Sequence, residues 1–319
     1  MQQSNKPYHD KEVGDFKRDV GHRTLLIAFS LAIIAVATSS FSSTSTAADT
    51  SSKTTNTPES SSADNPSLKE YKKLVENYYS LDKQKAGHIS CQVSSSDPQA
   101  YIDIMHQKFG NRLTVDINPL DFFVTYDRTK GVSINSPHIK VSVSPDAEHA
   151  DVEQLENSGK AMETFLKGIF SQEEQIIADR FKERNMISPS PETLKNLSLT
   201  KNGDAVVVSY DEDDNKHIRT TYSGLTGRQT ETSPTANVTL TWDSQLLNGK
   251  LALAHLAIER IENSKKTNIT QSVSYQDLGS VFVPAHILVD VTAIEGTQQM
   301  KLPHLEIDFK DCKTSDLSP

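Results

Sequence analysis

Few residues in this sequence have the types and spacing that catalysis or metal binding needs. Ser80 and Lys83 fit the Ser-x-x-Lys pattern of serine acylases, but the Lys-Thr-Gly motif that accompanies it is missing from the sequence. The acidic run from Asp211 to Asn215 offers oxygen ligands, yet it lacks the Gly and the closing Glu of a calcium-binding loop. The sequence also contains no His-Glu-x-x-His motif and no glycine-rich phosphate loop. We therefore expect a protein that is not an enzyme and that has no cofactor and no metal site.

The charge of the chain limits the partners that it can bind. It has 33 Lys and Arg residues against 42 Asp and Glu residues, a net charge of −9, and its basic residues form no stripe. An acidic chain of this kind is a poor match for the phosphate backbone of nucleic acids. We expect no nucleic-acid partner, and we expect membrane contact only through the N-terminal segment, if that segment is not cleaved.

The N-terminal region has the pattern of an export signal. Basic residues come first, an uncharged apolar run follows over residues 24–38, and small residues come after it. Residues 1–48 are therefore predicted to be a signal peptide or a signal anchor, with residues 24–40 as the inner-membrane anchor in the second case. Residues 49–66 continue a Ser/Thr-rich stretch that predicts a disordered linker. Residues 67–319 then form a single domain, exported to the periplasm or cell envelope.

Cys91 and Cys312 are the only cysteines in the chain, and they lie in or beside predicted strands at opposite ends of the domain. In an oxidising compartment two such residues favour a disulfide bond. The sequence therefore predicts that the bond joins the first strand of the domain to the last, although two separate buried thiols would have the same spacing.

Most of the domain alternates between apolar and polar residues with a period of two, which is typical of strands with one covered face. Strands are predicted at 88–94, 113–117, 122–126, 139–143, 206–210, 218–222, 238–242 and several places between 272 and 313. Residues 251–261 are ambiguous, because the apolar positions change phase at His255. A strand with a β-bulge explains this change, but helical spacing fits as well.

Two segments have the 3.6-residue apolar period of helices, residues 67–81 and the longer stretch from about 150 to 185. The fold class is thus α+β, an antiparallel sheet with a long amphipathic helix over one face. If the helix covers a cavity, we expect Phe165, Leu166, Ile169 and Phe170 to line it, together with Trp242 from a strand.

The C-terminal part contains Tyr275, Gly279, Pro284, Gly296 and the closing segment 307–311, Ile-Asp-Phe-Lys-Asp. In this pattern it resembles the outer-membrane lipoprotein-sorting (LolA/LolB-like) family. It implies a curved antiparallel sheet or incomplete β-barrel that binds a lipid or a lipoprotein acyl chain in its hollow. The alternative is an exported, non-catalytic protein-interaction module of the cell envelope, whose sheet interior is filled by its own side chains.

Overall fold

The computed structural model describes residues 66–84, 86–95, 99–100, 102–103, 106, 110–119, 121–145, 152–181, 195–212, 216–263, 265–279, 281–302 and 304–316. The predicted export signal and nearly all of the predicted linker lie outside these residues. Residues 213–215 of the acidic run also lie outside them.

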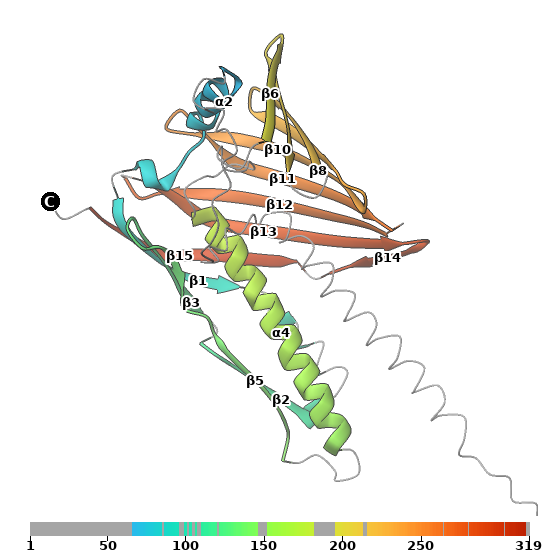
Figure 1. Ribbon diagram of the computed structural model, residues 1–319. Coiled ribbons are helices and arrows are strands. Elements are labelled where there is room, and N and C mark those ends of the chain that lie inside the picture. The colour runs from blue at the N-terminus through green and yellow to red at the C-terminus, as the bar shows by residue number, and fades with distance from the viewer. Residues whose placement is uncertain are drawn as a thin grey trace, which may run out of the picture.

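Thirteen strands of the described chain form one antiparallel sheet, the main sheet (Figure 1). Its order from edge to edge is β4-β3-β1-β15-β13-β12-β11-β10-β9-β8-β7-β6, with β14 beside β13, so the sheet is open rather than closed into a barrel. The strands before the long helix are β1 (Ala86–Ser95), β3 (Phe122–Asp127) and β4 (Gly131–Ile134). Those after it are β6 (Lys195–Asn202), β7 (Ala205–Glu212), β8 (Lys216–Ser223), β9 (Thr226–Thr232), β10 (Ala236–Leu247), β11 (Lys250–Glu262), β12 (Lys265–Asp277), β13 (Phe282–Glu295), β14 (Gln298–Lys301) and β15 (Leu305–Asp316).

From β6 to β13 each strand pairs with the next one along the chain, since only a few residues separate neighbouring strands. The turn between β10 and β11 shows how. Asn248 and Gly249 have φ angles of 49° and 75°. Two positive φ angles in a two-residue turn match the right-handed twist of the flanking strands, and Asn-Gly is the sequence that adopts them most readily.

The ambiguous stretch 251–261 is a strand, and it contains the predicted irregularity. In the β10–β11 ladder Asp243 pairs with His255 but Ser244 pairs with Leu253, so the register shifts by one residue at this point. The extra residue, Ala254, lets Leu253 and Leu256 both be buried. The phase change in the sequence therefore marks a β-bulge.

The first and last strands of the main sheet are neighbours, since β1 pairs with β15 as well as with β3. The predicted disulfide bond between Cys91 and Cys312 is present and joins β1 to β15 across a sequence separation of 221 residues. Gln276 on β12 donates a hydrogen bond from Nε2 to Cys312 Sγ at 3.3 Å.

The long helix is α4 (Val152–Phe181). Its N-terminal part lies on a second sheet of two strands, β2 (Leu113–Asn118) and β5 (His138–Val143), where Glu163 Oε2 accepts a hydrogen bond from the Val141 N–H group at 3.1 Å. Its C-terminal end reaches the main sheet, where Phe181 packs against Phe309 with ring centroids 5.6 Å apart. The helix was expected to cover the open face of one sheet, whereas it spans two sheets (Figure 1).

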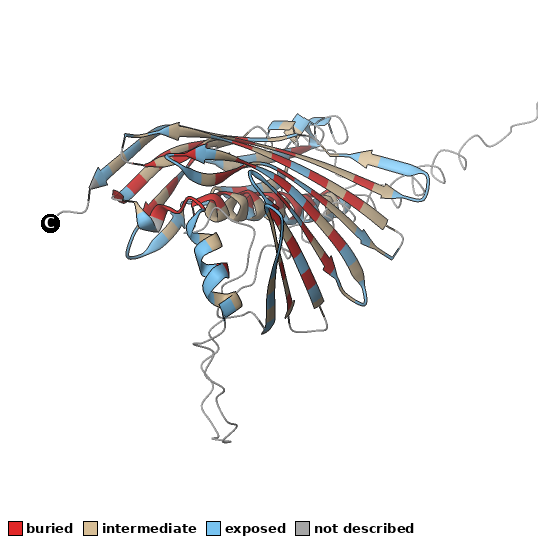
Figure 2. Ribbon diagram, turned by 90° about the horizontal axis from the view of Figure 1, so that it is seen from above, coloured by how far each residue is buried: buried red, intermediate tan, exposed pale blue. Residues whose placement is uncertain are grey.

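A shorter segment crosses the other end of the main sheet. Helix α2 (Pro66–Glu76) is followed by the 3-10 helices η2 (Leu81–Lys83) and, later, η3 (Gly110–Arg112). The predicted helix 67–81 ends earlier than expected because the chain after Glu76 pairs with β11. There Leu251 N–H donates to Asn77 O and Tyr79 N–H donates to Leu251 O, both at 2.8 Å. Figure 2 shows α2 and α4 on the same side of the main sheet.

Candidate functional site

The inner face of the main sheet, defined as the face that carries Trp242 and the C-terminal end of α4, has a continuous apolar strip. Leu240, Ile258, Ile269 and Val291 are successive partners on β10, β11, β12 and β13. The first three are 1%, 4% and 8% exposed. Because alternate residues of a strand point to the same face, the polar neighbours of these four point outward. We call the four residues the apolar band.

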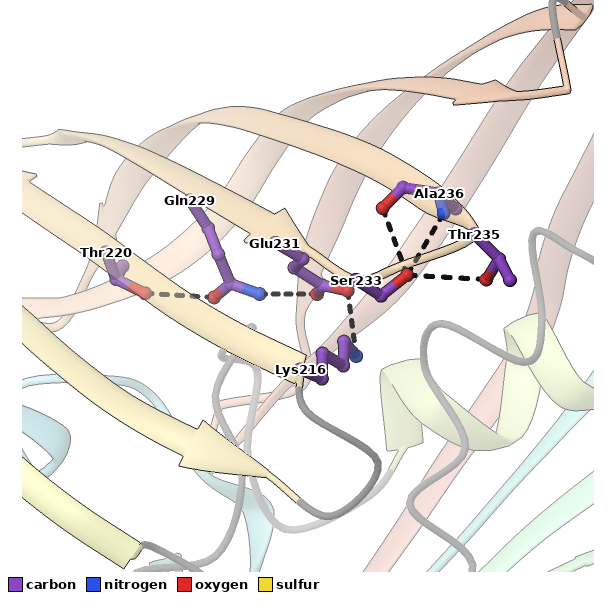
Figure 3. Close-up of polar contacts among 7 residues, drawn as sticks. All are labelled: Lys216, Thr220, Gln229, Glu231, Ser233, Thr235 and Ala236. Carbon is purple, nitrogen blue, oxygen red and sulfur yellow. Dashed lines mark hydrogen bonds and ion pairs between the residues drawn. The ribbon is translucent and has the colours of Figure 1, made fainter.

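On β8 and β9 the row of the band continues with Thr220 and Gln229, which begin a chain of polar side chains that extends into the next row, drawn in Figure 3. Thr220 Oγ1 donates to Gln229 Oε1 at 3.1 Å, and Gln229 Nε2 donates to Glu231 Oε1 at 2.8 Å. Lys216 Nζ completes the chain with an ion pair to Glu231 Oε2 at 2.8 Å. Thr220, Gln229 and Glu231 are 5% exposed or less. Buried polar groups are costly unless hydrogen-bonded, and here each side chain has a partner.

The polar chain ends at a pocket of about 200 Å³ at the margin of the inner face. The pocket, called here the mouth pocket, is lined by Lys216, Glu231, Ser233, Thr235, Ala236, Val238 and Arg260. Glu231, Val238 and Arg260 are partners on β9, β10 and β11, in the row next to the apolar band. The mouth pocket and the apolar band are thus about 7 Å apart along the strands, the length of two residues.

Two local arrangements fix the walls of the mouth pocket. Arg260 donates from Nε and Nη2 to Glu262 Oε2 at 3.2 and 2.8 Å, which holds the guanidinium group against β11. Ser233 closes the β9–β10 turn, since its hydroxyl group donates to Ala236 O at 3.1 Å and accepts from Ala236 N–H at 3.0 Å (Figure 3). The guanidinium group of Arg260 and the hydroxyl-bearing residues Ser233 and Thr235 thus lie around the mouth pocket.

The third row of the inner face carries an aromatic cluster. Trp242 and Tyr222 meet edge to face with centroids 5.7 Å apart, and Tyr78 meets Tyr222 at 6.4 Å. The partner of Trp242 on β9 is Gly227. A Cβ atom at Gly227 would lie 2.0 Å from Trp242 Cζ2, so the indole ring occupies the space that any other residue would fill.

The outer face of the main sheet has a groove of about 550 Å³ that runs across β8 to β12. Its walls are mainly short polar side chains, among them Thr241, Asp243, His255, Thr270 and Ser272. His255 Nδ1 lies 3.0 Å from Ser272 Oγ, and Asp243 is the β10 partner of His255. This row resembles a Ser-His-Asp set in composition. However, acyl transfer also needs N–H donors aimed at the reacting oxygen, and the backbone around Ser272 is engaged in ladders with β11 and β13.

The five residues predicted to line a cavity are all buried but are not all together. Phe165, Leu166, Ile169 and Phe170 lie in the middle of α4 at exposures of 6% or less. Trp242 lies in the aromatic cluster on β10. Arg180, near the end of α4, donates a hydrogen bond from Nη2 to Gln271 Oε1. Gln271 is in the same row as Trp242, two strands away. Phe170 is ten residues, or about 15 Å, further up the helix from Arg180.

Burial shifts the pKa values of three groups at the inner face. It raises the pKa of Tyr79 to about 12, although the hydrogen bond with the Phe282 backbone opposes the shift. It also raises the pKa of Tyr78 and lowers that of Arg180. The Tyr79 hydroxyl donates to Phe282 O at 3.1 Å and accepts from Phe282 N–H at 2.7 Å. The tyrosine hydroxyls are therefore neutral structural groups at physiological pH.

The structure describes the Ser-x-x-Lys candidate in part. Ser80 is buried at 6% exposure, whereas Lys83 is exposed to solvent. Among the described residues no group of three or more His, Cys, Asp or Glu side chains could hold a metal ion. Within the same residues no helix is long and apolar enough to cross a membrane.

Comparison with known proteins places the chain in no family. No protein-family model matches it, no curated protein matches it, and no solved structure matches it.

Proposed function

We propose that this chain is a non-enzymatic binding protein of the cell envelope that holds the apolar part of a lipid or lipoprotein acyl chain against the inner face of its main sheet. One observation carries the proposal: the apolar band adjoins a polar pocket at the margin of the same face. Amphiphiles need an apolar surface and a polar opening side by side. The resemblance of residues 275–311 to the lipoprotein-sorting family supports the same class of ligand.

The proposal includes export to the periplasm or envelope. The disulfide bond between Cys91 and Cys312 supports an oxidising compartment, because such bonds are rare in a reducing cytosol. The apolar run at residues 24–38 supports export independently of the fold.

The test is binding of a homologous series of saturated fatty acids to the full chain, by native mass spectrometry and by displacement of a fluorescent fatty acid. Each methylene group buried against the band contributes up to about 0.8 kcal/mol, so affinity should rise by up to about fourfold per methylene. Affinity that does not depend on chain length, or no binding at all, would refute the proposal.

Variants at the band locate the site. Ile258→Trp adds bulk within the band and should abolish binding, whereas Leu246→Trp should not, because Leu246 is 60% exposed. If Ile258→Trp does not fold by circular dichroism, Ile258→Ala serves instead. That variant enlarges the site and should shift the preference toward longer chains; an unchanged preference counts against the band.

A second candidate function, the envelope interaction module with a filled interior, is favoured by the burial itself. Leu240 is 1% exposed and Leu166 is 1% exposed, so these side chains are already covered. On this alternative the outer groove is the contact surface. If the purified chain carries no co-purified lipid and binds no fatty acid, the interaction module is favoured over acyl-chain binding.

A further inference from the structure

The groove on the outer face of the main sheet, called here the outer groove, has the size of a ligand site. Its volume of about 550 Å³ lies within the range of about 300 to 1,000 Å³ that ligand pockets occupy. It crosses the neighbouring strands β8 to β12. Four strand spacings of about 4.8 Å give it a length of about 19 Å. The outer groove is therefore long enough for a ligand made of several linked units.

The walls of the outer groove are two rows of outward-pointing side chains that run across the strands. One wall is the row of partners on β9 to β12, Arg228, Thr241, Ala257 and Thr270. The other wall is the row of partners on β10 to β12, Asp243, His255 and Ser272. The residues between the two rows point to the inner face, so they leave only backbone on the floor of the groove.

The floor cannot take up a peptide as an added strand. Strands β9, β10 and β11 each pair with a neighbour on both sides. Their backbone N–H and C=O groups are thus used in the ladders, whereas strand addition requires a free sheet edge. Recognition in the outer groove therefore depends on the side chains of its walls.

The walls carry balanced charges. Arg228 is the cation and Asp243 the anion of the lining, which gives a formal charge of zero with His255 neutral. Both charged side chains are exposed, and neither has an ion pair or a side-chain hydrogen bond with another residue of the described chain. A site without net charge attracts neither anions nor cations, so the outer groove suits a neutral ligand.

The polar groups of the walls match a ligand that is rich in hydroxyl groups. The hydroxyl groups of Thr241 and Thr270 can each donate and accept a hydrogen bond, while Asp243 accepts and Arg228 donates. Sugar hydroxyl groups also donate and accept, so they can pair with all of these groups. The threonine methyl groups and Ala257 offer small apolar contacts to the C–H faces of sugar rings.

We propose that the outer groove binds a neutral, linear oligosaccharide whose chain runs across the strands from β8 to β12. Asp243 and Arg228 supply charge-assisted hydrogen bonds, and the threonine hydroxyl groups supply neutral ones. The site lies on the opposite face of the main sheet from the apolar band, so the inference goes beyond acyl-chain binding and does not depend on it. It also gives the envelope interaction module a partner of stated chemistry, a glycan.

The experiment measures the binding of oligosaccharides to the full-length protein by isothermal titration calorimetry. The probes are the cello-, malto- and N-acetylchito- series, each from the monosaccharide to the hexasaccharide. A sugar unit that adds one net hydrogen bond should raise the affinity by about 2- to 10-fold. In at least one series the affinity should therefore rise with chain length, and it should level off when the chain outgrows the groove.

Variants of the walls test the polar contacts. Asp243→Asn removes a charged acceptor and should weaken binding by about tenfold or more. Thr241→Val keeps the shape but removes a hydroxyl group, and it should weaken binding by about 2- to 10-fold. Thr239→Val is the matched control, because Thr239 is the next outward-pointing residue of β10 and lies outside the groove lining. This control should leave the affinity unchanged.

A further pair of variants tests the position of the site. Ala257→Trp places a large ring in the groove and should abolish binding. Ile261→Trp should not, because Ile261 lies on the same face of β11, is 42% exposed and is not part of the lining. Both positions point outward, and urea unfolding confirms that each variant is folded.

The outcomes separate this inference from the proposed function. Dissociation constants weaker than about 10 mM for every series, or affinities that do not depend on chain length, would overturn the inference. Tetragalacturonate or the chitosan tetramer should bind no better than the neutral tetrasaccharides, and a tenfold preference for either would overturn the assignment of a neutral ligand. A fatty acid should not displace the oligosaccharide, because displacement would place both ligands on one surface. If oligosaccharides bind as expected and no fatty acid binds, this inference stands and the proposed acyl-chain binding falls.

Discussion

Replacing Gly227 by alanine should destabilise the protein strongly, because one side chain already occupies the space. The new Cβ atom would lie 2.0 Å from Trp242 Cζ2 and 2.1 Å from Cε2. Carbon atoms in contact are normally about 3.5 to 4.0 Å apart, so the ring would have to move by roughly 1.5 Å or more. Trp242 is 4% exposed and contacts Tyr222, which leaves little room for that movement.

The loss of folding stability caused by Gly227→Ala has two limits. If the indole ring shifts within the cluster, overpacking costs about 1 to 3 kcal/mol. If the ring leaves the core, the loss approaches that of a large-to-small substitution, about 3 to 5 kcal/mol. We therefore expect Gly227→Ala to lower the free energy of unfolding by about 2 to 4 kcal/mol.

Urea unfolding measures this cost, and the chain offers a direct probe, since Trp242 is its only tryptophan. Its fluorescence should be blue-shifted in the native protein and should move to the red in Gly227→Ala. Arg228→Ala, at the adjacent outward-facing position, is the control and should change stability by no more than about 0.5 kcal/mol.

A double-mutant cycle tests the cause. Trp242→Leu makes room for the new methyl group, so Gly227→Ala should cost about 1 to 3 kcal/mol less in that background, measured by circular dichroism. An effect of Gly227→Ala within the range of the Arg228 control would refute the steric argument, as would additivity of the two changes.

Two further predictions concern stability. The pKa of Tyr79, about 12 when folded against about 10 when unfolded, means that its neutral hydroxyl stabilises the fold fully below pH 10 and loses that effect by pH 12. Urea unfolding should show wild type losing up to about 2 kcal/mol more than Tyr79→Phe between pH 9 and pH 11.5, and equal losses would contradict the assigned burial. Replacing Cys91 and Cys312 together by serine opens a loop of 221 residues, which the loop-entropy model values at about 5 kcal/mol at most. An unchanged urea midpoint would show that the bond adds no stability.

The sequence was informative where one face of an element is apolar. Cys91 and Cys312 were paired correctly because each lies in or beside a predicted strand and no other cysteine competes. The phase change at His255 fitted a bulged strand or a helix, and the structure has the bulged strand, because burial brings apolar residues to one face. Helix α4 was predicted for the same reason, because its apolar stripe continues over many turns.

The sequence was uninformative where inward-facing residues are polar. Strand β9 escaped prediction because Gln229 and Glu231, which point inward, give no apolar alternation. The mouth pocket was missed with it, since Glu231 is one of its walls. Two other strands, β4 and β6, were also missed. At the end of α2, Tyr78 and Tyr79 keep helical spacing in the sequence, but pairing with β11 takes them out of the helix. Such contacts join residues far apart in the sequence, so local apolar periodicity cannot predict them.

The position of β1 between β3 and β15 limits the order in which the strands can pair during synthesis. Strands β6 to β13 form hairpins between neighbours in the chain, so they can fold as soon as they are made. β1 must wait until the ribosome has reached β15, more than 200 residues later, and until then one of its edges is unpaired. An unpaired strand edge is prone to association with other chains. A chaperone that holds the nascent chain extended would protect the unpaired edge of β1. If the chain is exported before it folds, β1 and β15 pair after export, in the same compartment.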